Sequence, residues 1–170
     1  MSDRSLQPVD GYSPGVGRYV AMLLDTRSRL THDLENFDET DLDRQPEWAP
    51  NSIGTLPYHV AAIELDWTFA DLCETEEFPE GTDHWFRVDV REDDGRLTPV
   101  VEPLDRHLDR LQWIRGHLLA ALSGLNDSDL DRVFNHWNPS SGSWIIQHLM
   151  QHEAEHRGQI GEIRAALSHQ

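Results

Sequence analysis

WIIQHLMQHEAEHRGQIGEIRAAL, which runs from Trp144 to Leu167, has the apolar spacing of a long helix. A helix turns about 100° per residue, so residues three and four apart share a face. One face of this segment carries a continuous apolar stripe: Ile145, Leu149, Ile160, Ile163 and Leu167. His152 and His156 fall inside that stripe. We therefore predict an amphipathic helix whose core side holds two imidazoles one turn apart.

The histidine pair is a candidate metal site. A spacing of four residues lets a ring nitrogen of His152 and one of His156 reach the same ion at about 2.0–2.1 Å. A buried ring nitrogen without a partner carries a desolvation cost, which a metal ion would remove. A hydrogen-bonded core network and a pH-sensitive cluster are the alternatives that the spacing leaves open. We interpret the pair as metal ligands and assign no metalloprotease activity to it.

An ion that is open for catalysis needs a third protein ligand and a vacant position. Another helix must supply that ligand. His59 and His107 both lie on the flanks of apolar stripes, and spacing alone prefers His59 only slightly. His148 comes one turn before His152 but lies about 80° from the centre of the stripe, so we place it beside the site.

Composition restricts the partners of this protein. The chain has 170 residues and a net charge of −17, and all of its 14 basic residues are arginine. Such a surface repels nucleic acid and anionic membranes, so we expect neither as a partner. Adaptation to high salt would account for the charge, because salt screens the self-repulsion. An ordinary acidic, solvated surface is the alternative.

The same sequence indicates a cytoplasmic protein. No apolar run approaches the ~18 residues of a membrane span, and the N-terminus lacks the pattern of a signal peptide. Cys73 is the only cysteine, which excludes a disulfide framework or a cysteine-built zinc site. We expect Cys73 to be a small buried filler. Arg157 could meet an anionic substrate or pair with a nearby glutamate, and the sequence leaves both open.

Periodicity predicts one domain, residues 1–170, of four helices after an extended arm at 1–14. The expected helices cover 15–37, 52–73, 100–123 and 144–167. Pro57 is awkward inside the second, so that helix either starts nearer Thr55 or bends in its first turn. The long connection at 74–99 could return the chain to the other end, so that neighbouring helices run parallel. Within it, 85–91 could form a strand or lie across the helices.

A weak internal repeat links the two halves of the chain. Asp41–Arg44 (DLDR) recurs as Asp129–Arg132, and a register of 89 aligns His59 with His148 and Glu64 with Glu153. Chance in an acidic sequence is the alternative. If the repeat is real, two helix pairs are related by a pseudo-twofold axis, which would bring His59 near the histidines of the last helix.

Two segments carry a family resemblance. SIGTLPYHVAAIELDW at 52–67 and WIIQHLMQHEAEHRGQI at 144–160 resemble the DinB-like superfamily, which includes bacillithiol and mycothiol transferases and the mycothiol-dependent maleylpyruvate isomerase. The resemblance implies an all-α four-helix bundle with up-down-down-up connectivity. It also implies a divalent metal, commonly zinc or nickel, held by His59, His152 and His156. Members are often homodimers, and we expect one here.

The resemblance also implies a function. Characterised relatives activate a low-molecular-weight thiol, so we expect a metal-dependent thiol S-transferase that acts on a small electrophile, with unknown catalytic residues. A non-catalytic, stress-associated metal-binding protein is the alternative. In a third possibility no metal binds, and His59, His152 and His156 form a hydrogen-bonded core network.

Overall fold

The computed structural model describes residues 5–35, 37, 39–134 and 139–168. Over these residues the chain is mostly helical, which confirms the expected all-α class. The long helices are α1 (Pro14–Glu35), α2 (Thr55–Asp66), α4 (Leu104–Ser123) and α5 (Gly142–Leu167). The shorter elements are η1 (Glu39–Asp41), the π-helix η2 (Trp67–Leu72), α3 (Thr82–Trp85), η3 (Asp127–Leu130), β1 (Val133–Phe134) and β2 (Ser140–Ser141). β1 and β2 pair antiparallel.

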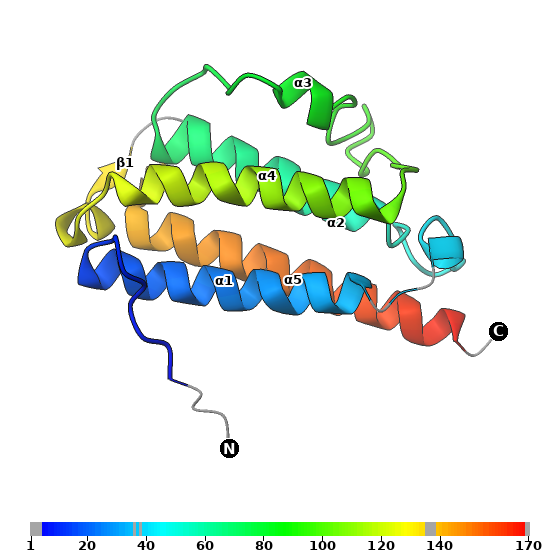
Figure 1. The fold of residues 1–170 in the computed structure, drawn as a ribbon. Coiled ribbons are helices and arrows are strands. Elements are labelled where there is room, and N and C mark those ends of the chain that lie inside the picture. The colour runs from blue at the N-terminus through cyan, green and yellow to red at the C-terminus, as the bar shows by residue number, and fades with distance from the viewer. Residues whose placement is uncertain (1–4, 36, 38, 135–138, 169–170) are drawn as a thin grey trace.

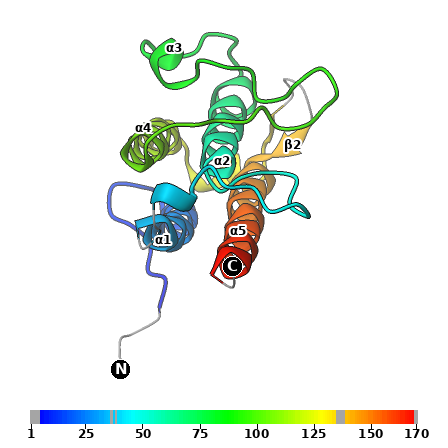
Figure 2. The ribbon, with the colours of Figure 1, turned by 90° about the vertical axis from the view of Figure 1, so that its right-hand side faces the viewer.

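The four long helices lie side by side (Figure 1). Seen end on, α4 and α2 form the upper pair and α1 and α5 the lower pair, with α2 packed against both α4 and α5 (Figure 2). In Figure 1, α1 and α5 run from left to right, whereas α2 and α4 run from right to left. Among the helices that the structure describes, none is both long and apolar enough to cross a membrane.

Helix α1 begins at Pro14 and ends at Glu35, close to the predicted 15–37. Proline suits the first turn of a helix, because its missing N–H would have no partner inside the helix. The N–H groups of Gly15 and Val16 donate to Asp127 Oδ1 at 2.7 and 3.1 Å. A carboxylate from η3 therefore caps α1 and complements its positive end.

Helix α2 begins at Thr55, which decides between the two readings of Pro57. Pro57 is the third helical residue, so no hydrogen bond within the helix is lost. Its N-cap is Gly54, two residues after the predicted start at Ser52. The helix continues into a π-helical turn at Trp67, which the sequence did not predict. Cys73 follows this turn and is exposed, so the expectation of a buried filler was wrong.

The connection between α2 and α4 crosses over the helices without an 85–91 strand. Trp85 ends the short helix α3, and only an isolated bridge joins Arg91 to Leu97. The segment is tied down by side chains of the long helices: Arg110 Nε donates to the Trp85 carbonyl at 2.8 Å, and Tyr58 Oη donates to the Val88 carbonyl at 2.6 Å. Hydrogen bonds to these two carbonyls hold this segment without a sheet partner.

Helix α5 forms over the stretch from which the prediction began. Ser141 is its N-cap and accepts the Trp144 N–H at 3.2 Å. Every apolar residue of the predicted stripe is buried: Ile145, Leu149, Ile160, Ile163 and Leu167. The core thus lies along the inner faces of α1, α2, α4 and α5 and fixes the rotation of α5 about its axis.

Candidate metal centre

Three imidazoles converge between α2 and α5. His59 extends from α2, while His152 and His156 extend from successive turns of α5. His152 Nε2 lies 3.1 Å from His59 Nε2 and 3.1 Å from His156 Nε2. The structure therefore brings together the three residues that the resemblance implied, and one ligand atom from each falls within 4.8 Å of the others. His59 is 3 % exposed, and the other two are half-buried.

The contacts among these nitrogens suit an ion better than hydrogen bonds. A neutral imidazole offers one N–H and one in-plane lone pair, so His152 Nε2 cannot pair well with two other ring nitrogens at once. An ion placed between them would accept all three lone pairs. In a tetrahedral zinc site with Zn–N bonds of about 2.0–2.1 Å, ligand nitrogens lie about 3.3 Å apart. The donor set therefore fits a divalent metal ion.

Burial prepares these rings as ligands. Desolvation, followed by the charges of His152 and His156, lowers the pKa of His59 to about 3. Desolvation is also the main cause that lowers the pKa of His152 to about 4. The pKa of His156 falls in the same direction for the same main reason. All three rings are therefore neutral at pH 7, which is the form that binds a metal.

The outer nitrogens of the rings differ in their partners. His156 Nδ1 contacts Gln159 Oε1 at 3.1 Å, one turn further along α5, and this contact orients the ring. His59 Nδ1 is buried and has no hydrogen-bond partner. Packing, rather than a carboxylate behind the ring, therefore fixes the orientation of His59 among the described residues.

The other candidate histidines lie elsewhere. His107 is fully buried in α4, not on a flank, and its Nδ1 lies 3.1 Å from Arg110 Nη1. His148 stacks flat on Trp144, with ring centroids 5.0 Å apart and planes at 5°, and its centroid lies 6.1 Å from that of His152. It is therefore beside the cluster, as expected. Arg157 donates to Asp33 at 2.6 Å, a partner that the sequence did not suggest.

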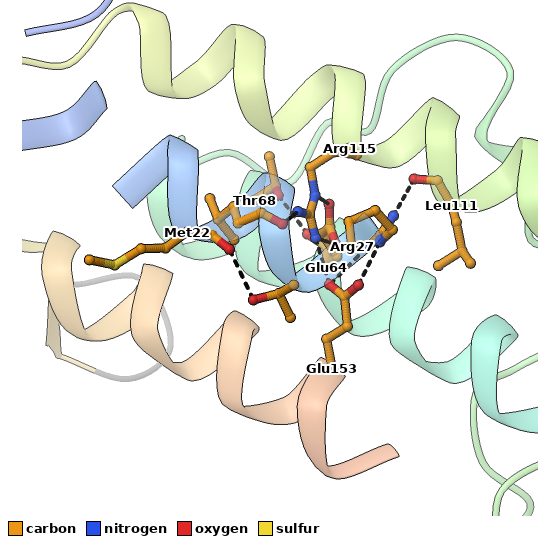
Figure 3. A network of polar contacts seen from close by, with 9 residues as sticks. Met22, Arg27, Glu64, Thr68, Leu111, Arg115 and Glu153 are labelled. Atoms are coloured by element: carbon orange, nitrogen blue, oxygen red, sulfur yellow. Dashed lines mark hydrogen bonds and ion pairs between the residues drawn. The ribbon is translucent and has the colours of Figure 1, made fainter. Parts of the chain in front are cut away.

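A second polar cluster lies behind the histidines, in the core. Arg27 of α1 and Arg115 of α4 each pair with both Glu64 of α2 and Glu153 of α5 (Figure 3). The shortest contacts are 2.5 to 2.7 Å, and none of the four residues is more than 8 % exposed. We call these four residues the charged quartet. It joins all four long helices, with two positive and two negative charges.

The charged quartet has a twofold pattern. Arg27 Nη1 donates to the Leu111 carbonyl at 2.5 Å, and Arg115 Nη1 donates to the Leu23 carbonyl at 2.6 Å. Both arginines and both leucines are 88 residues apart, which is the spacing of the DLDR repeat. The sequence repeat marked the glutamates but missed the arginines, although the same spacing could have identified them.

The position of Glu153 also bears on whether this site could be that of a metalloprotease. Residues 152–156 read HEAEH, which does fit the His-Glu-x-x-His pattern of metalloproteases, so the sequence gives no ground for excluding that activity. The structure does give a ground for excluding it. The Glu153 carboxylate is 1 % exposed and is engaged by Arg27 and Arg115, so it cannot act as a general base toward a substrate at the histidines.

Comparisons with known proteins bear on the family and the fold of this chain. Residues 22–160 match the family described as the DinB superfamily. A crystal structure described as the conserved protein of locus from Enterococcus faecalis is similar in fold, with a TM-score of 0.69. It is 16 % identical in sequence, and the match covers 86 % of this chain and 92 % of that one. No protein of curated function matches.

Proposed function

Because this chain belongs to the DinB superfamily, we propose that it is a divalent-metal-dependent enzyme, a thiol S-transferase that acts on a small electrophile. The observation that carries the proposal is the convergence of three neutral imidazole nitrogens from two helices. We assign His59, His152 and His156 as the ligands, and zinc or nickel as the metal, within a four-helix bundle of up-down-down-up connectivity.

The residues in and around the histidine cluster would have separate roles. His59 is held rigidly in the core, whereas half-buried His152 and His156 leave the outer side of the cluster accessible to a small molecule. The charged quartet joins α2 to α5 and so keeps His59 in register with the other two ligands. When bound, the ion supplies Lewis-acid stabilisation of a thiol's anion at neutral pH.

A cobalt-loaded protein tests the proposal directly. Adding a low-molecular-weight thiol should produce the near-ultraviolet charge-transfer absorption of cobalt bound to sulfur. His152→Ala should lose cobalt binding while keeping the helical fold, and the matched variant His84→Ala, at an exposed histidine of α3, should retain both signals. Unchanged thiol transfer by the metal-stripped protein would contradict the proposal.

A structural ion is the second candidate, because an ion held by His59 and His152 would cross-link α2 to α5. In that case zinc should raise the melting temperature, yet no thiol should bind to the loaded protein. Homodimer formation and a cytoplasmic location rest on the family and on composition. Light scattering after size-exclusion chromatography checks the homodimer.

A further inference from the structure

We propose that Trp144, Trp67 and His148 form a subsite for a planar aromatic ring, carried by the substrate at the end remote from the metal-binding group. The inference rests on the proposed function for the metal-binding end of that substrate. The ring site itself is argued from the side chains at the start of α5 and the end of α2.

The subsite is a hollow with two indole walls. A cavity of about 470 Å³ is lined by Trp67, Pro139, Ser140, Ser141 and Trp144. The indole rings of Trp67 and Trp144 have centroids 5.5 Å apart and planes tilted by 46°. Two large aromatic side chains at the mouth of a cavity provide much apolar contact area with little flexibility to lose.

Trp144 is partly exposed beside a stacked ring. His148 stacks flat against the indole at 5.0 Å and 5°, while Trp144 as a whole is 47 % exposed. A planar ring on the exposed part of the indole would add a second aromatic contact, an arrangement that aromatic systems favour. Trp67, with its centroid 4.7 Å from that of His148, closes the side of this stack.

One polar side chain of the wall, that of Ser141, already has partners. Ser141 Oγ accepts the Trp144 N–H at 3.2 Å and lies 3.1 Å from Ser143 Oγ. The two indoles are the largest side chains of the wall, which favours an aromatic ring over a polyhydroxylated one. The π-helical turn that begins at Trp67 supports the assignment, because such turns occur frequently at functional sites.

The subsite lies near the histidine cluster. The His148 ring lies between them, since its centroid is 4.7 Å from that of Trp67 and 6.1 Å from that of His152. Trp144 precedes His152 by eight residues of α5, which corresponds to about 12 Å along the helix axis. A ligand with a metal-binding group at one end and a ring at the other would span the two sites with a linker of roughly six to eight carbons.

A linker series tests this prediction. Phenylalkanethiols with two to ten methylene groups are titrated calorimetrically into the zinc-loaded full chain. Affinity should peak near the predicted length, where the phenyl compound should bind about tenfold more tightly than its cyclohexyl analogue. Trp144→Ala should remove this tenfold advantage, whereas Trp48→Ala, at a tryptophan 58 % exposed in the α1–α2 connection, should leave it intact.

A second readout needs no metal. In metal-free protein labelled with 5-fluorotryptophan, a phenylalkanol should shift the fluorine resonances of Trp144 and Trp67, but not that of Trp48. Equal affinities for phenyl and cyclohexyl compounds, or equal losses in Trp144→Ala and Trp48→Ala, would overturn the subsite. If the alcohol binds Trp144 and the thiol adds no affinity on the loaded protein, the subsite stands and the thiol-transferase proposal fails.

Discussion

The charged quartet and the histidine cluster are built on the same helices but have opposite hydrogen-bonding states. Glu153 and His152 are neighbours in α5, and Glu64 follows His59 by five residues in α2. In the quartet, four carboxylate oxygens meet arginine donors, and the remaining arginine nitrogens donate to carbonyls. In the cluster, three ring nitrogens face one another, and His152 Nε2 lies 3.1 Å from both of the others but can pair well with only one.

This difference indicates a structural role for the quartet and a ligand-binding role for the histidine cluster. Burial alone disfavours the charges of Glu64 and Arg115, but their mutual attraction and hydrogen bonds outweigh it, so the pKa of Glu64 is lowered and that of Arg115 is raised. The quartet is therefore saturated and offers nothing to a ligand. The histidine cluster has the opposite property, because its three ring nitrogens are not saturated by hydrogen bonds and converge on one point.

The largest expected effect comes from breaking the quartet. Arg115→Met leaves two buried carboxylates with only Arg27 as a partner, which should lower the free energy of unfolding by about 3–5 kcal/mol. Urea denaturation measures the loss. Arg29→Met, which removes an exposed pair with Asp25, should cost far less, because solvent screens that pair. Similar losses in the two variants would show that the quartet is not a structural centre.

Removing a proposed metal-ligating histidine should weaken metal binding and leave the stability of the metal-free protein unchanged. His152→Ala should weaken zinc binding by at least about a hundredfold, because two imidazoles cannot replace three. The metal-free variant should be as stable as the metal-free parent, because the deleted ring is a poorly paired polar group. Competition with a chromogenic chelator gives the affinity, and thermal melts give the stability. Unchanged zinc affinity would remove this side chain from the site.

The stability of the metal-free protein should depend on pH, because His59 is buried in its uncharged form. The pKa of His59 is about 3 in the folded state and about 6.5 when unfolded, so between these values the unfolded state binds the extra proton. Stability is complete above pH 6.5 and should fall by about 2 kcal/mol from His59 alone by pH 5. Denaturation at several pH values measures the slope, which should flatten in His59→Gln.

Salt should have the smallest effect and should distinguish surface from core. Because the net charge is −17, raising KCl from 0.1 to 2 M should increase the melting temperature by a few degrees. The loss of stability in Arg115→Met should stay the same, since buried pairs are screened much less than exposed ones. A melting temperature that does not rise with KCl would contradict adaptation to high salt.

Local patterns predicted much of this molecule. The positions of α1, α4 and α5 followed from apolar periodicity. Proline chemistry limited the start of α2 to two choices. The sequence could not predict the π-helical turn at Trp67 or the path of 73–103, because these depend on tertiary contacts such as the Arg110 bond to Trp85.

The sequence by itself determined the helices, the acidic surface and the histidine pair on α5, because spacing along one helix sets which side chains share a face. Spacing alone left the third histidine open between His59 and His107, the family resemblance implied His59, and the tertiary structure brings His59 to the pair. Only the tertiary structure decided that Arg27 and Arg115 occupy the core and that Glu153 faces them instead of the cluster. Helical spacing fixes direction within a helix, whereas the meeting of side chains from different helices depends on how those helices pack.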